Sequence, residues 1–292
     1  MEMVLTGTGT SHGVPVIGCD CRVCRSSDEK NKRNRCSAYV SSPARIVIDT
    51  GPEFRIQALK FNIKSLDAVL LTHGHADHLN GLDDLRVFSH TKSVDPSKCS
   101  SDETEGPGLP IYSNARTFED VKKRFDYIFT PVKEGGSKPK LSFIDCARFS
   151  ARNPLVIKSI SIIPVPLIHG SLETCGWILK DSSDGKCIAY LTDCNSISGE
   201  SFEIIKSVGK IDHFVIDALR EKPHSTHFSF LEAMEAAEKI GAGHTWFTHM
   251  THNMLHSEVQ DYIDKKIPEF PGLEKITKEG GSVSPAYDGL IL

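Results

Sequence analysis

Short apolar runs rich in Val and Ile recur along the chain, and each is followed by Gly, Asp, His or Thr. Runs of this length and composition predict buried β-strands. In chain order they are RIVIDTG, LDAVLLTH, ISIIPVPLIHG, KCIAYLTD, HFVIDALR and HTWFTH.

Helical patterns lie between some of these runs. The clearest covers residues 229–241, where Ser229 is the expected N-cap, Glu232 follows three residues later and Gly241 is the expected end. Residues 53–62 and 198–209 show weaker helical patterns. Strands that alternate with helices predict an α/β fold.

The chain of 292 residues is long enough for one large α/β domain. Residues 91–110 are rich in Ser, Pro, Gly and acidic side chains, and residues 131–140 have a similar composition. Neither segment shows periodicity, so both are predicted to be loops. We expect a single domain over residues 1–292, with 91–110 as a flexible insertion.

The formal net charge of −4 gives no broad basic surface that would bind nucleic acid or an anionic membrane. No apolar run approaches the roughly 20 residues that span a bilayer, and the N-terminal residues do not resemble a secretory signal. The nine cysteines are an odd number in a long chain, which favours reduced thiols or metal ligands over disulfides. We therefore expect a cytoplasmic protein.

Metal-binding side chains gather where the predicted strands end. The motif THGHADH directly follows one apolar run, and three later runs end in PLIHG, YLTD and WFTH. Because the carboxyl ends of parallel strands meet at one edge of a sheet, we expect these side chains to lie together. The candidate ligands are His73, His75, Asp77, His78, His169, Asp193 and His249.

Seven ligands exceed the three or four that one tetrahedral zinc ion takes, so the set predicts two divalent ions, Mn²⁺ or Zn²⁺. Asp193 is the expected bridge, because a carboxylate has two oxygens. A single histidine at a strand end is more often structural than a ligand. The density of the first motif and the three matching strand ends favour ligands here.

A second candidate metal site lies near the N-terminus. Cys19, Cys21 and Cys24 have the spacing C-x-C-x-x-C, which brings three thiolates together in a geometry that zinc favours. His252, shortly after His249, is the candidate fourth ligand of a structural zinc. Ordinary reduced cysteines and a disulfide are the alternatives.

The motif THGHADH resembles the signature of the metallo-β-lactamase superfamily, and the later IHG, TD and TH follow in that superfamily's order. The resemblance implies a four-layer αβ/βα sandwich with a dinuclear metal cleft. It assigns one ion to His73, His75 and His169, the other to Asp77, His78 and His249, and the bridge to Asp193. It also places Asp49 as a buried carboxylate that orients a ligand. Asp217 is a candidate for the same role, or an ordinary strand-end residue.

The opening GTGTSHGVPVIGCDC and the later AYDG resemble one branch of that superfamily, the phosphoribosyl 1,2-cyclic phosphate phosphodiesterases of phosphonate breakdown. In that branch the cysteine trio and the trailing histidine form a structural zinc site. The resemblance also implies that His227 contacts phosphate and acts as a general acid. His224 is the alternative for that role.

Together these features predict a dinuclear metal-dependent phosphodiesterase that opens a small cyclic phosphate by attack of a metal-bound hydroxide, which Asp77 orients. A tRNA 3′-end processing endonuclease is one alternative, but such enzymes carry a basic arm and the insertion here is acidic. A thioester or lactone hydrolase is another, although it lacks a phosphate-contacting histidine. A protein that only binds would be expected to have a broken ligand set. We expect a small phosphorylated substrate, no nucleic acid and no membrane, and a homodimer is a hypothesis based on the fold.

Overall fold

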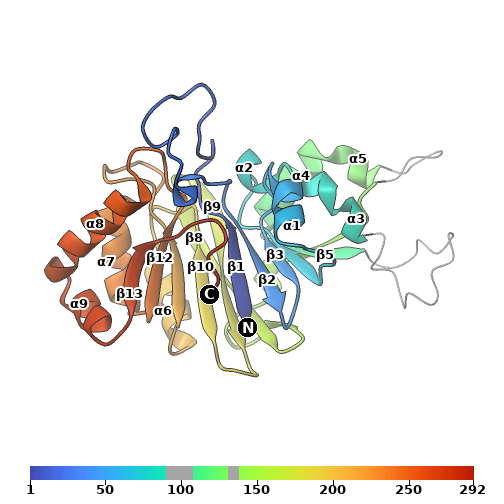
Figure 1. Ribbon diagram of the computed structural model, residues 1–292. Coiled ribbons are helices and arrows are strands. Elements are labelled where there is room, and N and C mark those ends of the chain that lie inside the picture. Colours follow the sequence, from blue (N-terminus) through green and yellow to red (C-terminus); the bar gives the residue numbers. More distant parts are fainter. Residues whose placement is uncertain (90–107, 131–137) are drawn as a thin grey trace.

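The computed structural model describes residues 1–89, 108–130 and 138–292, which form two packed β-sheets (Figure 1). In spatial order the first sheet contains β1 (Glu2–Gly7), β2 (Ser37–Ser42), β3 (Ile46–Ile48), β4 (Ala68–Leu70), β5 (Leu109–Ser113) and β6 (Leu141–Asp145). The second contains β13 (Ser282–Pro285), β12 (His244–Thr248), β11 (His213–Asp217), β10 (Cys187–Leu191), β9 (Leu172–Asp181), β8 (Ile160–His169) and β7 (Leu155–Ile157).

Both sheets are mixed, and their strand directions decide where the chain can build a site. Strands β3 to β6 are parallel, as are β10 to β13. Strand β9 is antiparallel to both β8 and β10, so β8 runs in the same direction as β10. The carboxyl ends of β8, β10 and β12 therefore share one edge of the second sheet.

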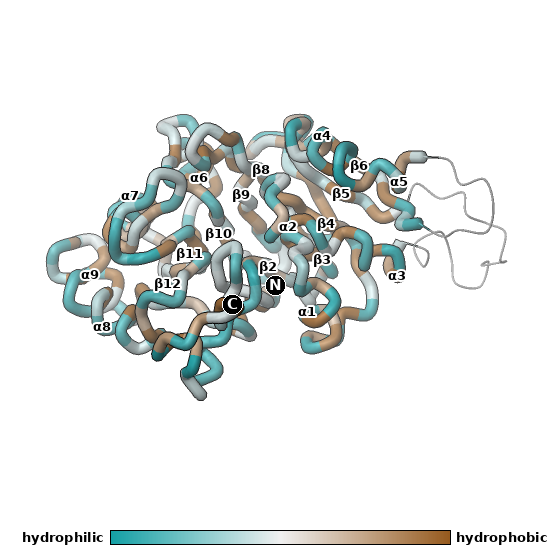
Figure 2. The backbone as a smooth tube through the Cα atoms, turned by 90° about the horizontal axis from the view of Figure 1, so that it is seen from above, coloured by the Kyte–Doolittle hydropathy of each residue, from teal (hydrophilic) through white to brown (hydrophobic). Residues whose placement is uncertain are grey.

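Helices cover the outer faces of the two sheets. On the first sheet they are α1 (Phe54–Lys60), α2 (Ala76–Leu79), α3 (Arg86–Ser89), α4 (Ala115–Arg124) and α5 (Asp126–Phe129). On the second they are α6 (Gly199–Ser207), α7 (Phe230–Ile240), α8 (His256–Lys266) and α9 (Pro271–Lys278). Figure 2 shows the two helix groups on opposite sides of the sheets. The predicted four-layer αβ/βα sandwich is confirmed.

Three hydrophobic layers hold the sandwich together. Trp177 and Tyr190 lie between the two sheets, Phe54 of α1 packs against the outer face of the first sheet, and Phe214 and Phe247 pack under α6 to α9. All five side chains are fully buried. Burying a large apolar side chain stabilises a fold by about 1.5–3 kcal/mol. Central strands such as β10 are apolar on both faces because each face meets another layer.

The predicted strands and helices are all present. The six apolar runs form β3, β4, β8, β10, β11 and β12, and the three helical patterns form α1, α6 and α7. Helix α7 has the expected capping box between Ser229 and Glu232 and ends at Gly241 in the left-handed conformation. Of the predicted insertion at 91–110, only residues 108–110 belong to the described residues, and the loop prediction is wrong at 109–110, where β5 begins. Residues 131–137 also lie outside the described residues.

Candidate metal centre

The strand ends bring the predicted ligands to one edge of the sandwich. His73 follows β4, His169 is the last residue of β8, Asp193 follows β10, and His249 directly follows β12. The remaining three candidates lie at the start of the short helix α2: His75, Asp77 and His78.

Seven side chains form two adjacent groups, each with its ligand atoms within 4.8 Å of one another. The first group contains His73, His75 and His169, and the second contains Asp77, His78, Asp193 and His249. Asp193 lies between the groups: Oδ2 is 3.8 Å from His73 Nε2 and 3.2 Å from His249 Nε2, and Oδ1 is 3.2 Å from His78 Nε2. This is the position expected of a bridging carboxylate.

The donor atoms of this cluster suit divalent metal ions. The Nε2 atoms of His73, His78 and His249 are buried, and none has a hydrogen-bond partner among the described residues. Burying such atoms without a partner costs about 1–3 kcal/mol each. Imidazole nitrogens and carboxylate oxygens converging in this way are the ligands that Zn²⁺ and Mn²⁺ accept. The residues present therefore fit two metal ions.

Asp49 orients one of the ligands from behind. Its Oδ2 accepts a hydrogen bond from His78 Nδ1 at 2.7 Å, while Thr72 donates to the same carboxylate through its backbone N–H and its hydroxyl at 2.8 and 2.7 Å. Because Nδ1 carries the hydrogen, His78 presents the lone pair of Nε2 to the cluster. This geometry matches the role expected of Asp49, a buried carboxylate that orients a metal-binding histidine.

A ligand in the other group is fixed by a backbone carbonyl. His169 Nδ1 donates to the carbonyl oxygen of Thr226 at 2.6 Å, which leaves Nε2 of His169 to face the metal cluster. Sequence analysis did not find Thr226, because a backbone carbonyl carries no side-chain signal. The only available signal was its place one residue before His227.

Together, burial and neighbouring charges lower the pKa values of His73 and Asp193 and raise that of His78. Burial lowers the pKa of His73 well below its usual value, and the neighbouring His78 adds to the shift, so His73 is neutral and able to bind a metal. Burial raises the pKa of Asp193, but His249 and His78 outweigh it and hold that pKa well below the usual range. Burial opposes protonation of His78, but the three carboxylates around it raise its pKa well above the usual value. Metal binding at His78 would therefore displace a proton.

His227 lies against the ligand cluster without belonging to the three-residue or the four-residue ligand group. Its ring stacks on His249 with centroids 4.6 Å apart and planes 18° apart, and it contacts His169 with centroids 4.5 Å apart. Its Nδ1 is 2.6 Å from Asp217 Oδ2, and burial lowers the pKa of its imidazole. His224 is exposed and its ring contacts that of His227, whereas the His227 ring contacts His169 and His249, so of these two histidines it is His227 that lies against the ligand cluster.

Asp217 is a candidate for orienting a metal ligand, but the histidine that it hydrogen-bonds is His227, which lies outside the two ligand groups. The carboxylate also accepts from the backbone N–H of Cys194 at 2.9 Å. It is fully buried, so both contacts are shielded from water. Spacing in the sequence could not identify His227 as this partner, because the conformation of the loop between β11 and α7 determines where His227 lies.

Three of these residues adopt the left-handed backbone conformation that favours glycine. The φ angles are 61° for Asp49, 52° for Asp193 and 60° for His249. Such a conformation is uncommon for residues with a side chain, although aspartate tolerates it better than most. Strained backbone of this kind concentrates at functional sites.

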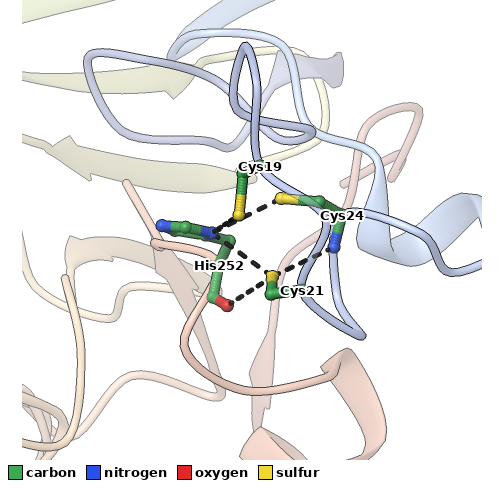
Figure 3. Close-up of side chains that lie close together, drawn as sticks. All are labelled: Cys19, Cys21, Cys24 and His252. Atoms are coloured by element: carbon green, nitrogen blue, oxygen red, sulfur yellow. Dashed lines mark hydrogen bonds between the residues drawn. The ribbon is translucent and has the colours of Figure 1, made fainter.

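The cysteine cluster forms a second, separate site. Figure 3 shows Cys19, Cys21 and Cys24 around His252, with their Sγ atoms 3.4, 3.5 and 3.4 Å from its Nδ1. A tetrahedral zinc with Zn–S of about 2.3 Å and Zn–N of about 2.0 Å separates sulfur from nitrogen by about 3.5 Å. The observed spacing therefore fits a zinc site of three cysteines and one histidine.

The thiols of this cluster differ in acidity. The backbone N–H of Cys24 lowers the pKa of Cys21 to about 6 against the opposing effect of burial, and His252 adds to the shift. Burial raises the pKa of Cys24 to about 11. All three are free thiols, so the disulfide alternative does not apply to this structure. A bound zinc ion would hold the set as thiolates.

Comparison with known proteins agrees with this architecture. The family described as "Beta-lactamase superfamily domain" matches residues 44–250. A solved structure of a diphosphatase from the PhnP family shares 35% sequence identity, aligns with 100% of this chain and 96% of its own, and superposes with a TM-score of 0.76. None of the helices in the described part of the chain is long and apolar enough to cross a lipid bilayer.

Two curated relatives carry different names. An octanoyltransferase from Porphyromonas gingivalis is 34% identical over 96% of this chain, but the chain spans only 52% of that relative's length. A ribonuclease Z from Clostridium kluyveri is 26% identical over 80% of this chain and 86% of its own length. The family match over most of the chain, the fold and the solved relative together show that this protein belongs to the beta-lactamase superfamily and has the metallo-β-lactamase fold.

Proposed function

We propose that this protein is a dinuclear metal-dependent phosphodiesterase acting on a small phosphorylated substrate. The observation that carries the proposal is His227, a buried histidine that stacks on His249 and is held by Asp217 beside the ligand cluster. A histidine in this position can contact an oxygen of a phosphoryl group. The names of two relatives, a diphosphatase and a ribonuclease Z, support phosphorus chemistry over the other reactions of the superfamily.

Two bound divalent ions would supply an activated water and neutralise the phosphoryl oxygens. Asp193 would be shared between the two ligand groups, and His73, His75 and His169 would complete one of them. Asp77 lies beside His249 and His78, where its carboxylate would accept a hydrogen bond from that water and orient it. His227 presents Nε2 to the substrate because Asp217 holds Nδ1.

Proton transfer to the leaving oxygen is the second task of His227. Burial lowers its pKa, so without substrate the imidazole is neutral. An anionic phosphoryl group next to the ring favours the protonated form, because an opposite charge at close range raises a histidine pKa. Binding of the substrate would thus favour protonation of His227, which could then donate the proton to the leaving group.

The test is hydrolysis of two substrates by the manganese-loaded and zinc-loaded protein. Ribose 1,2-cyclic phosphate represents a small cyclic phosphate, and bis(4-nitrophenyl) phosphate represents a generic diester. The expected result is turnover of at least one, lowered in His227→Ala by about 10²-fold or more. Absence of turnover on both substrates, with two ions bound, would overturn the proposal.

We also propose one structural zinc at Cys19, Cys21, Cys24 and His252. The sulfur–nitrogen spacings support it, as does the fixed position of the cysteine loop, where Arg22 forms a bidentate ion pair with Glu258 of α8. The free state of the described cysteines further supports a reducing compartment such as the cytoplasm.

A second candidate function is hydrolysis of an acyl ester or thioester, and two observations favour it. The P. gingivalis relative is named an octanoyltransferase. A groove of about 510 Å³ also lies along the end of β8, and its lining includes Phe149, Pro166, Ile168 and Ile204. Hydrolysis of an octanoyl thioester, measured in parallel with that of the phosphodiesters, decides between the two functions. The acyl reaction has no phosphoryl group for His227 to contact.

A further inference from the structure

A basic loop borders the catalytic histidine, and the proposed reaction leaves it without a role. Residues 220–226, with the sequence REKPHST, connect β11 to the segment that precedes α7. Three of its side chains can carry positive charge: Arg220, Lys222 and His224. The loop ends one residue before His227, so anything it binds lies next to the phosphoryl group under attack.

Contacts from both the loop and the metal centre fix the loop in place. The ligand His169 donates through Nδ1 to the carbonyl of Thr226 at 2.6 Å, and Asn195 donates to the carbonyl of Ser225 at 3.2 Å. Within the loop, the Arg220 guanidinium donates to the carbonyls of Lys222 and Pro223 at 3.3 and 3.4 Å. Because these bonds tie the loop to itself and to the ligand His169, they hold its position relative to the metal ligands.

His224 is the side chain that this loop presents to solvent beside the site. Its ring centroid lies 5.4 Å from that of His227. Its Nδ1 accepts from the backbone N–H of Thr226 at 3.4 Å and lies 3.2 Å from the Thr226 hydroxyl. With Nδ1 acting as acceptor, the hydrogen of neutral His224 is on Nε2. No atom in the described part of the chain accepts that hydrogen, so Nε2–H is available to a ligand.

The acidic residue of the loop does not cancel this donor. Glu221 interacts with Tyr262 and Lys266 of α8, away from the histidines. Lys222 and His224 are exposed, and Lys222 has neither an ion pair nor a hydrogen bond through its side chain among the residues that the structure describes. The loop therefore offers a directed N–H donor and positive charge, a combination that suits phosphate.

We propose that this loop binds a second phosphate, and that the substrate is a diphosphate diester. The inference rests on the proposed phosphodiesterase function and names its substrate class. Two histidines in ring-to-ring contact can each hold one of two phosphates that share a bridging oxygen: His227 the phosphate under attack, His224 its neighbour. Each phosphorus of such a compound is doubly substituted, so the reaction remains that of a diester.

The reaction consumes one water. The water oxygen forms a new bond to the phosphorus beside His227, and the bond from that phosphorus to the bridging oxygen breaks. The bridging oxygen leaves with the bonding electron pair as part of the second phosphate and receives a proton from His227 or water. The products are two phosphate monoesters, and His224 stabilises the charge that develops on the departing phosphate.

The test compares P¹,P²-bis(4-nitrophenyl) diphosphate with bis(4-nitrophenyl) phosphate, which has a single phosphate, using metal-loaded protein. His224→Ala should lower kcat/KM for the diphosphate by about 10-fold or more, as expected for loss of a hydrogen bond to a charged group, and change it less than twofold for the monophosphate diester. His224→Gln, which keeps an N–H donor, should recover part of the loss. Lys210→Ala, which removes an exposed lysine near the start of β11, is the matched control and should change neither value.

Equal losses on both substrates, or no loss on either, would overturn the role of His224. Failure of wild-type protein to hydrolyse either substrate would overturn the phosphodiesterase function instead. The loop can then be tested separately by measuring the binding of methylenediphosphonate, a diphosphate analogue that resists hydrolysis. Calorimetry should show wild-type protein binding methylenediphosphonate at least about 10-fold more tightly than His224→Ala does, with equal affinities for inorganic phosphate. Equal affinities for methylenediphosphonate would contradict the proposal.

Discussion

Asp217 Oδ2 lies 2.6 Å from Nδ1 of His227, and both side chains are buried at the edge of the metal centre. The carboxylate fixes the ring so that Nε2 is left for the substrate. Asp49 makes the corresponding contact to Nδ1 of His78, so a buried carboxylate fixes the ring of each of these two histidines.

Replacing Asp217 by Asn should lower kcat by about 10- to 100-fold, the range typical of lost supporting hydrogen bonds. The amide can donate to Nδ1 and so favours the wrong tautomer of His227. Metal content should stay at the wild-type value, because Asp217 accepts from His227 and Cys194 rather than from a ligand. Steady-state kinetics and elemental analysis check the prediction. A loss of bound metal equal to the loss of activity would contradict the positioning role.

Replacing Asp193 by Asn should reduce the number of active-site ions bound per chain. The carboxylate lies within 3.8 Å of candidate ligand nitrogens in both groups, so its charge and second oxygen would serve both ions. We expect inductively coupled plasma mass spectrometry to find fewer than two active-site ions, with activity lowered in parallel. Asp212→Asn serves as the control, because Asp212 precedes β11 and so lies at the opposite edge of the sheet from Asp193. Full occupancy in the Asp193 variant would refute its bridging role.

Replacing Cys21 by Ser should remove one zinc ion per chain and leave the two active-site ions bound. Because binding free energy at a structural zinc site is also folding free energy, the melting temperature should fall by about 5 °C or more. Asp20→Asn changes an exposed neighbour in the same loop and should leave both values unchanged. An unchanged zinc content in Cys21→Ser would mean that this cluster holds no metal.

Acid should destabilise the protein through His256. Arg33 is fully buried, and its guanidinium donates to Nδ1 of His256 at 3.2 Å, so His256 must be neutral in the folded state. Burial lowers the pKa of His256 to about 4, and Arg33 adds to the shift. Between the usual histidine pKa of about 6.5 and pH 4 the unfolded chain takes up a proton that the folded chain does not, so stability falls as pH decreases through this window.

His256→Gln removes this titration while a side-chain oxygen can still accept from Arg33. The drop in melting temperature between pH 7 and pH 5 should therefore be smaller in the variant than in wild-type protein. Thermal denaturation of both proteins across this range tests the prediction, and the other titrating groups cancel in the difference. Parallel curves for the two proteins would show that His256 does not couple folding to pH.

The candidate ligands could be predicted from sequence because His73, His169, Asp193 and His249 stand at or just after the ends of apolar strands, and the other three follow His73 in one dense motif. The supporting groups could not. Thr226 acts through a carbonyl, and the partner of Asp217 depends on how residues 220–226 turn. Strand β9 also escaped prediction, although it is as long as β8, because its sequence LETCGWILKD shows neither a short apolar run nor strict alternation.

The left-handed conformations of Asp49, Asp193 and His249 set stability against activity at three positions. Each such conformation costs on the order of 1 kcal/mol, a cost that glycine would remove. Glycine at any of these positions would, however, delete a ligand or the carboxylate behind one. A screen for thermostability alone would therefore reward changes that inactivate the enzyme, and an engineering campaign on this fold should hold these three residues constant while it varies the rest of the chain.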